Sequence, residues 1–173
     1  VMDLSGKYVM PGIINLHGHL GNVKGLVQDP KNYTRRNLED QLRTYAAYGV
    51  TTVVSMGSDN DIAFQVRTEQ RSGRPTYTRV YTAGRGFTVK DGFPTNKGNV
   101  PGVPYEPTQP AEVPAQIDEL TSHRPDVVKI WVDDRFGDFK KTPIAISRPI
   151  IEGAHKHGIK VIAHVFYLND AKQ

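Results

Sequence analysis

The chain has 173 residues, of which 38% are hydrophobic and 23% are charged, and its formal net charge is +4. This is the balance of a core-forming globular domain, and no apolar run approaches the roughly 18 residues that a membrane span needs. The Lys and Arg residues are scattered and cysteine is absent, so we expect no nucleic-acid partner, no membrane and no thiolate metal ligand. A cytoplasmic, a periplasmic and a secreted location all stay open.

The first predicted strand ends in a pair of histidines. Pro11-Gly12 is a turn signal, and the run that starts at Ile13 alternates with period two as far as His17 and His19. Both imidazoles therefore lie on one face of the strand. Two interpretations stay open at this point: a site for one metal ion, or two polar residues at the end of a strand.

The flanks of this strand carry further signals. Gly18 removes a side chain from the opposite face, where backbone or a helix can come close, and Ile14 and Leu16 on that face are predicted core contacts. Residues 1–10 are interpreted as the end of an N-terminal β segment. The run 20–32 contains two glycines and a proline, and it is predicted to be a loop.

Helices and strands alternate along the rest of the chain. Helices are predicted from residue 34 to 48, from 59 or 60 to 73, from about 109 onward, from 147 to 158 and from 168 onward. Strands rich in β-branched residues are predicted at 50–56, 79–83, 127–134 and 160–167. Repeated βα units indicate a parallel sheet, which both an open α/β sheet and a (β/α)8 barrel contain.

The helix boundaries are predicted from capping signals. Gly49 and Gly158 follow the last apolar positions of their helices and are predicted C-terminal stops. Ser147 is the predicted N-cap of the helix 147–158, with Pro149 in its first turn.

The strand 127–134 carries a lysine among apolar residues. Lys129, Trp131 and Asp133 share one face of this strand. Burial of the Lys129 ammonium would lower its pKa and favour the neutral amine, which can react with carbon dioxide. The alternative is a lysine paired with Asp133 or another carboxylate. In the next strand, His164 is surrounded by apolar residues, so it is either a satisfied core residue or a ligand.

This ordered set of motifs resembles the amidohydrolase superfamily, whose members are metal-dependent hydrolases built on a (β/α)8 barrel. The motifs are Pro-Gly, an apolar strand ending in His-x-His, then Lys129 in one strand and His164 in the next. The resemblance covers the whole chain and points to the branch with imidazolonepropionase-like and Xaa-Pro or Xaa-Arg dipeptidase-like enzymes. It implies an α/β fold: a partial (β/α)8 TIM barrel of about five βα units. A complete barrel needs about 250 residues, so residues 11–173 are expected to be its first part, truncated after strand five.

The same resemblance implies a site and a reaction. His17 and His19 would hold one cation, carboxylated Lys129 would be the catalytic bridging ligand, and His164 would hold a second cation. One or two divalent metal ions are expected, with zinc as the first candidate, and a metal-activated water would hydrolyse an amide, peptide-like or cyclic amide C–N bond. The substrate would be a small molecule or dipeptide-like, with Asp133 and Tyr167 as predicted substrate contacts.

The resemblance also places a histidine on strand six and an aspartate on strand eight of a complete barrel, beyond the five strands read here. We therefore expect this chain alone to be inactive. Because barrel loops that follow strands share the catalytic face, the long segment 84–107 is predicted to lie over the mouth of the site.

Two other classes of protein remain possible. The first is a non-catalytic half-barrel that associates with itself or with a complementary fragment, because five parallel strands leave unpaired edges. The second is a small α/β binding module, although no glycine-rich phosphate loop follows any predicted strand.

Overall fold

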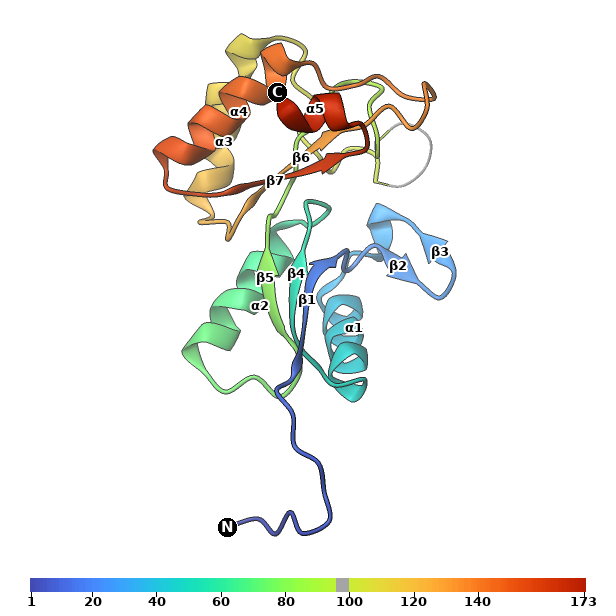
Figure 1. Cartoon of the computed structure of the whole chain (residues 1–173), viewed down its shortest axis with the longest axis vertical. Coiled ribbons are helices and arrows are strands. Elements are labelled where there is room, and N and C mark those ends of the chain that lie inside the picture. Colours follow the sequence, from blue (N-terminus) through green and yellow to red (C-terminus); the bar gives the residue numbers. More distant parts are fainter. Residues whose placement is uncertain (96–99) are drawn as a thin grey trace.

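The computed structural model describes residues 1–95 and 100–173 and is a mixed α/β structure with parallel strands (Figure 1). The main strands are β1 (Ile13–Gly18), β4 (Val50–Ser55), β5 (Arg79–Thr82), β6 (Val128–Val132) and β7 (Val161–Val165). The helices are α1 (Arg35–Ala47), α2 (Asp61–Ser72), α3 (Val113–Ser122), α4 (Ile144–Lys156) and α5 (Leu168–Lys172). The predicted alternation of strands and helices is confirmed.

The parallel direction of the strands is confirmed as well. Strands β1, β4 and β5 form one parallel sheet in that order, and β6 and β7 form a second parallel pair. Phe87 connects the two, because its N–H donates to the Lys129 carbonyl at 2.8 Å and its carbonyl accepts from the Trp131 N–H at 2.9 Å. The segment after β5 is therefore held against β6, which brings the carboxyl ends of the first sheet close to the pair β6 and β7.

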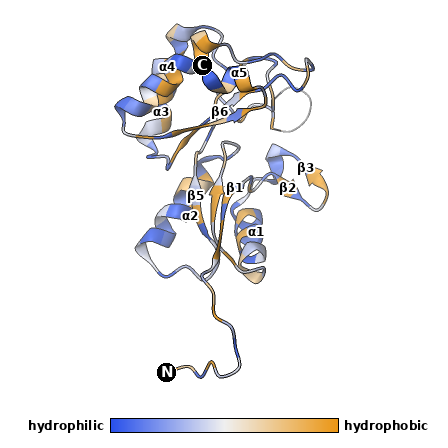
Figure 2. Ribbon diagram, in the orientation of Figure 1, coloured by the Kyte–Doolittle hydropathy of each residue, from blue (hydrophilic) through white to orange (hydrophobic). Residues whose placement is uncertain are grey.

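Two hydrophobic clusters fill the structure. The N-terminal cluster comprises Leu20, Tyr33, Leu38, Leu42, Val53, Ala63, Val66 and Val80. The C-terminal cluster comprises Phe64, Phe87, Tyr105, Val113, Ile117, Leu120, Val128, Ile130, Ile146, Ile150 and Ala154. The strands carry hydrophobic stretches, whereas the helices mix hydrophobic and hydrophilic residues (Figure 2). Within the described residues, no helix has both the length and the apolar character needed to cross a membrane.

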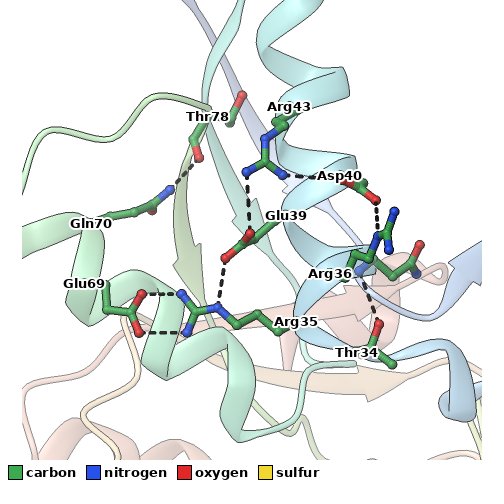
Figure 3. A network of polar contacts seen from close by, with 10 residues as sticks. Thr34, Arg35, Arg36, Glu39, Asp40, Arg43, Glu69, Gln70 and Thr78 are labelled. Carbon is green, nitrogen blue, oxygen red and sulfur yellow. Dashed lines mark hydrogen bonds and ion pairs between the residues drawn. The ribbon is translucent and has the colours of Figure 1, made fainter.

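Helices α1 and α2 are also joined by a polar contact at the surface. Arg35 donates to Glu39 at 2.9 Å within α1 and, through Nη1, to Glu69 of α2 at 2.8 Å (Figure 3). Arg35 and Glu69 are 43% and 56% exposed, so solvent screens this ion pair and it is expected to contribute little to stability. Packing in the N-terminal cluster, rather than this contact, holds the two helices together.

One face of β1 is packed near its end and open earlier along the strand. A Cβ atom at Gly18 would lie 2.7 Å from Val53 Cγ2 and 3.5 Å from the Tyr45 hydroxyl of α1, which confirms the predicted close approach of a helix. Ile14 and Leu16, which share this face, are 60% and 67% exposed, so their prediction as core contacts was wrong. The helix that approaches Gly18 leaves these two side chains uncovered.

The start of α4 was also mispredicted. The helix begins at Ile144 after the extended residue Pro143, and Ser147 is a buried residue inside the helix rather than its N-cap. The Ser147 hydroxyl lies 3.4 Å from the Pro143 carbonyl, the bond of a helical serine to the preceding turn. Burial of Ile146 extends the apolar face of the helix N-terminally. The stops at Gly49 and Gly158 are confirmed, with φ values of 78° and 70°.

Residues 1–10 and the segment after β1 complete the description. Residues 1–10 extend away from the sheets and contain a turn in which the Lys7 N–H bonds to the Leu4 carbonyl at 2.9 Å (Figure 1). The predicted loop 20–32 instead contains a short hairpin, β2 (Val23–Lys24) with β3 (Val27–Gln28). Its turn uses Gly25 at φ 61°, and Gln41 of α1 donates to the Val23 carbonyl at 2.6 Å.

Candidate metal centre

The predicted histidines meet at the carboxyl ends of the strands. His17 lies near the end of β1 and His19 directly after it, whereas His164 comes from β7. All three line one cavity of about 250 Å3. Lys129 lies within electrostatic reach of His17 and His19. The structure thus brings together residues that are up to 147 positions apart, from His17 to His164.

The two histidines of β1 point at each other. His17 Nε2 and His19 Nε2 are 3.3 Å apart, which is also about the separation expected for two nitrogens bound tetrahedrally to zinc at 2.0–2.1 Å. The second ring nitrogen of His19, Nδ1, lies 3.2 Å from the Ser58 hydroxyl. A hydroxyl can donate to or accept from an imidazole nitrogen, so this contact orients the His19 ring without fixing its tautomer.

The electrostatic environment keeps these imidazoles neutral. Desolvation, followed by the charges of His17, Lys129 and His164, lowers the pKa of His19 to about 4. Desolvation also lowers the pKa of His17, with Lys129 and His164 as the next causes. Neutral imidazole is the form that binds metal ions, so both rings are in a binding-competent state at neutral pH.

Lys129 is fully buried and has an unsatisfied amine. Its Nζ has no hydrogen-bond partner among the described residues, so the alternative of a lysine paired with Asp133 is not seen. The Lys129 amine lies 5.5 Å from the centroid of the Trp131 ring. Desolvation lowers the pKa of Lys129 to about 8, which leaves an appreciable neutral fraction near neutral pH.

Two glycines make the space that Lys129 and Trp131 occupy. A Cβ atom at Gly57 would lie 2.7 Å from Lys129 Cγ, and one at Gly86 would lie 2.3 Å from Trp131 Cζ3. Sequence reasoning missed this role. Glycine after a strand is an ordinary turn signal, and only the three-dimensional arrangement shows that the lysine needs the missing side chains.

His164 contacts an acidic side chain. Its Nε2 lies 3.0 Å from Asp133 Oδ2, and the other carboxylate oxygen of Asp133 accepts the Arg135 N–H at 2.9 Å. Tyr167, the other predicted substrate contact, donates to Asp134 Oδ1 at 3.1 Å. Both predicted substrate-contact residues are thus already bonded to protein groups.

Apolar side chains form the opposite wall of the cavity. Phe93, Pro94, Val100 and Trp131 line it, and the Phe93 ring centroid is 5.4 Å from that of His164. Phe93, Pro94 and Val100 of the segment 84–107 therefore lie at the site, in agreement with the prediction for these residues, while residues 96–99 lie outside the described residues. This wall would exclude water from one side of a bound molecule.

A buried carboxyl group lies behind the site and was not predicted as such. Asp59 is fully buried and accepts hydrogen bonds from Ser55 at 2.6 Å, Thr82 at 2.5 Å and Tyr33 at 2.8 Å. Desolvation raises the pKa of Asp59 to about 6, although these hydrogen bonds oppose the shift. The sequence offered Asp59 only as a possible helix cap, a role that Asn60 performs instead.

The donor set is compatible with a divalent cation. Within residues 1–95 and 100–173, no group of three or more His, Asp, Glu or Cys side chains is placed to hold one metal ion. Two imidazoles that converge beside an unpartnered, partly neutral lysine do fit such an ion, provided that the lysine carries a carbamate. Carboxylation would add two oxygen donors where the structure leaves a buried amine unsatisfied.

Comparison with solved structures supports this fold. A Xaa-Pro dipeptidase with bound methionine matches with a TM-score of 0.70 and 21% identity, over 90% of this chain and 43% of that one. A prolidase complexed with N-methylphosphonate-L-proline matches with a TM-score of 0.75 and 17% identity, over 95% of this chain and 45% of that one. The A. niger ochratoxinase matches with a TM-score of 0.70 and 17% identity, over 90% of this chain and 43% of that one.

These matches confirm the resemblance to amidohydrolases at the level of the fold. This chain spans less than half of each of these solved structures. No protein-family model and no curated protein sequence matches it. At these identities, similarity supports a common architecture, and the chemistry must be argued from the residues of the site.

Proposed function

We propose that this chain forms part of a (β/α)8 barrel and supplies metal ligands of a hydrolase that cleaves an amide, peptide-like or cyclic amide C–N bond. One observation carries the proposal: two facing imidazoles lie beside a fully buried lysine whose amine has no partner among the described residues. An unsatisfied buried amine is costly, so a structure that retains one within electrostatic reach of two imidazoles is expected to use it.

The proposed ligands are His17, His19, Lys129 and His164. The neutral Lys129 amine attacks carbon dioxide, forms an N–C bond and releases one proton, which leaves an anionic carbamate. His17 and His19 offer their Nε2 lone pairs, and Ser58 holds the His19 ring. A divalent cation held by these residues, zinc first, would polarise a carbonyl and lower the pKa of water.

The cavity wall suggests how a substrate would be oriented. Phe93 and Trp131 give apolar surface on the side of the cavity that faces the histidines. A small or dipeptide-like amide would rest an apolar group on this surface and direct its carbonyl to the imidazoles. The Tyr167 ring and hydroxyl remain a proposed contact at the rim, whereas the contacts of Asp133 favour another role.

Carboxylation of Lys129 can be tested without an activity assay. Wild-type protein and Lys129→Met are incubated with 13C-bicarbonate and diamagnetic zinc ion, and the carbamate is detected by 13C NMR at matched pH, while cobalt affinity is measured in separate samples. We expect a carbamate signal in wild type alone. We expect wild type to bind cobalt weakly and Lys129→Met to bind it with at least tenfold lower affinity. The exposed control Lys160→Met should bind cobalt with the affinity of wild type. Equal cobalt affinity in all three proteins, without a carbamate, would contradict the proposal.

Hydrolysis is tested with Xaa-Pro dipeptides and N-acyl amino acids as probes. Because two imidazoles and one carbamate are few ligands, we expect low or no turnover by this chain alone. Any turnover should be lost in Lys129→Met and retained in Lys160→Met. Turnover that is independent of Lys129 would show that another group acts.

We also infer a second property, association through the sheet edges. Ile14 and Leu16 of β1 and Phe166 after β7 are more than half exposed, although they lie on or beside strands that present unpaired backbone. A second copy or a complementary polypeptide would cover these apolar groups. Sedimentation is expected to show a dimer or larger species, and a stable monomer at micromolar concentration would contradict this inference.

A further inference from the structure

Asp133 is a buried acidic side chain that contacts His164, one of the histidines that line the cavity. It is 5% exposed, and both of its carboxylate oxygens are occupied, Oδ2 by His164 Nε2 at 3.0 Å and Oδ1 by the Arg135 N–H at 2.9 Å. Each oxygen is thus already engaged by one protein group, although each retains a further lone pair. The position of Asp133 at the end of β6 directs one oxygen across to the neighbouring strand β7.

We propose that Asp133 is a positioning residue: it holds His164 as the tautomer with the proton on Nε2, so that Nδ1 is the nitrogen that binds metal. This inference rests on the proposed metal site. It differs from the substrate contact predicted from the sequence, and it assigns the ligand atom of His164.

The geometry supports this role through the two nitrogens of the imidazole ring. A carboxylate accepts a hydrogen bond and cannot donate one, so Nε2 must carry a proton when it bonds to ionised Asp133. In a neutral ring, Nδ1 is then unprotonated and is the nitrogen able to bind a cation. Carboxylate partners of this kind orient metal-binding histidines and raise their basicity.

A second bond keeps the carboxylate itself in place. The Arg135 N–H donates to Asp133 in a tight turn where Arg135 has φ 49°, in the left-handed region. Residues with side chains rarely adopt this conformation without compensation. The Arg135 guanidinium also lies 4.9 Å from the centre of the Phe93 ring, which forms the wall of the same cavity. The turn therefore fixes Asp133 toward β7 from its other side.

His19 provides a contrast within the same site. Its Nδ1 faces the Ser58 hydroxyl, which leaves Nε2 toward His17. For His164 the occupied nitrogen is Nε2. The two rings would thus offer opposite nitrogens to a cation.

The test measures the tautomer of His164 directly in the metal-free protein. Long-range 1H–15N NMR spectra are recorded well above the usual pKa of imidazole for wild type, Asp133→Ala and Asp133→Asn, and His164→Gln assigns the resonances. Asp134→Asn is the matched control, because this adjacent carboxylate bonds to Tyr167 rather than to a histidine. Circular dichroism confirms that each protein is folded.

We expect wild type and Asp134→Asn to show a protonated Nε2 and an unprotonated Nδ1. In Asp133→Ala the Nδ1-protonated form should become populated, and in Asp133→Asn it should rise by a smaller amount, since a neutral amide oxygen accepts more weakly. Cobalt affinity should fall 10- to 100-fold in Asp133→Ala. If Asp133→Ala does not fold, the intermediate change in Asp133→Asn decides the question.

The outcomes separate this inference from the proposed function. A wild-type His164 with its proton on Nδ1, or a tautomer unchanged in both Asp133 variants, would overturn the positioning role. If the tautomer shifts as expected but cobalt binds to none of the proteins, wild type included, Asp133 positions His164 and the metal site is wrong. If cobalt binds with equal affinity to wild type and to Asp133→Ala, the assignment of the ligand atom is wrong.

Discussion

Asp59 and Lys129 are both fully buried ionisable residues, yet their surroundings are opposite. The Asp59 carboxyl accepts from the hydroxyls of Tyr33, Ser55 and Thr82. The Lys129 amine has no hydrogen-bond partner among the described residues. Burial moves both groups toward the neutral form, because it raises the pKa of Asp59 to about 6 and lowers that of Lys129 to about 8.

The difference separates a group that serves the fold from one that is available for chemistry. Asp59 joins Tyr33, in the segment after β1, to Ser55 and Thr82, the last residues of β4 and β5. Its desolvation is therefore partly offset by bonds that hold the strand ends together. Lys129 receives no such compensation from the protein. Its position costs stability, as residues at functional sites often do.

The largest effect is expected from removing the uncompensated group. Lys129→Met should raise the free energy of unfolding by about 3 kcal/mol at pH 7 in a buffer free of metal and carbon dioxide, because a folded-state pKa of about 8 against 10.5 penalises the ammonium. The wild type gains stability as pH rises from 8 to 10.5, so the stability difference between the variant and wild type should vanish at about pH 10.5. Urea denaturation at pH 7 and at pH 10.5 measures this difference. A variant less stable than wild type at pH 7 would show that the amine has a partner.

A comparable effect with the opposite pH dependence is expected for Asp59→Asn. Because the pKa of Asp59 is raised from 3.8 to about 6, the folded state retains the proton longer, and this group lowers wild-type stability by about 3 kcal/mol as pH rises from 4 to 6. In Asp59→Asn this fall in stability between pH 4 and 6 should be absent, whereas the exposed control Asp61→Asn should show the same fall as wild type. Thermal denaturation across this range compares them, and parallel curves for Asp59→Asn and wild type would refute the raised pKa.

A smaller loss is expected when a single partner of Asp59 is removed. Thr82→Val keeps the shape of the side chain but deletes the hydroxyl that donates to Asp59 and accepts the Gly84 N–H. The cost should be about 1–3 kcal/mol, since buried polar groups lose a partner. Thr51→Val, at an exposed residue of β4 whose hydroxyl lies 3.4 Å from the Ile13 carbonyl, should change stability by under about 0.5 kcal/mol. Equal denaturation midpoints for the two variants would deny that the Asp59 bonds hold the strand ends.

The smallest change in the free energy of unfolding is expected for substitution of an exposed apolar residue. Leu16→Lys should leave the free energy of unfolding within about 0.5 kcal/mol of wild type, because Leu16 is 67% exposed. The same change should weaken self-association through β1, as measured by sedimentation. A loss of several kcal/mol in dilute, monomeric protein would mean that this face is covered.

Local patterns predicted the elements, and pairs distant in the chain account for most of what was missed. The period of the strands and the glycines at 49 and 158 specify element type and helix ends, since both signals lie within a few residues. His17 and His19 share a face for the same local reason. The Asp133–His164 contact and the Tyr33–Asp59 bond join residues 31 and 26 positions apart, and no period encodes such pairs.

The start of α4 shows a different limit. Ser147 and Pro149 form a good capping pattern, but the apolar residue Ile146 extends the buried face and the helix begins earlier. Burial of an apolar side chain outweighed a local preference worth about 1 kcal/mol. Predicting this boundary requires knowledge of the surface on which the helix packs.

The position of α2 has a consequence for how the molecule unfolds. Ala63 and Val66 pack in the N-terminal cluster, while Phe64 of the same helix packs in the C-terminal cluster. Neither cluster can open fully without uncovering one side of this shared helix. Opening of either cluster alone therefore exposes apolar side chains of α2 to water, which costs free energy. Native-state hydrogen exchange should then show the two halves opening as one cooperative unit, with the α2 amides among the slowest to exchange.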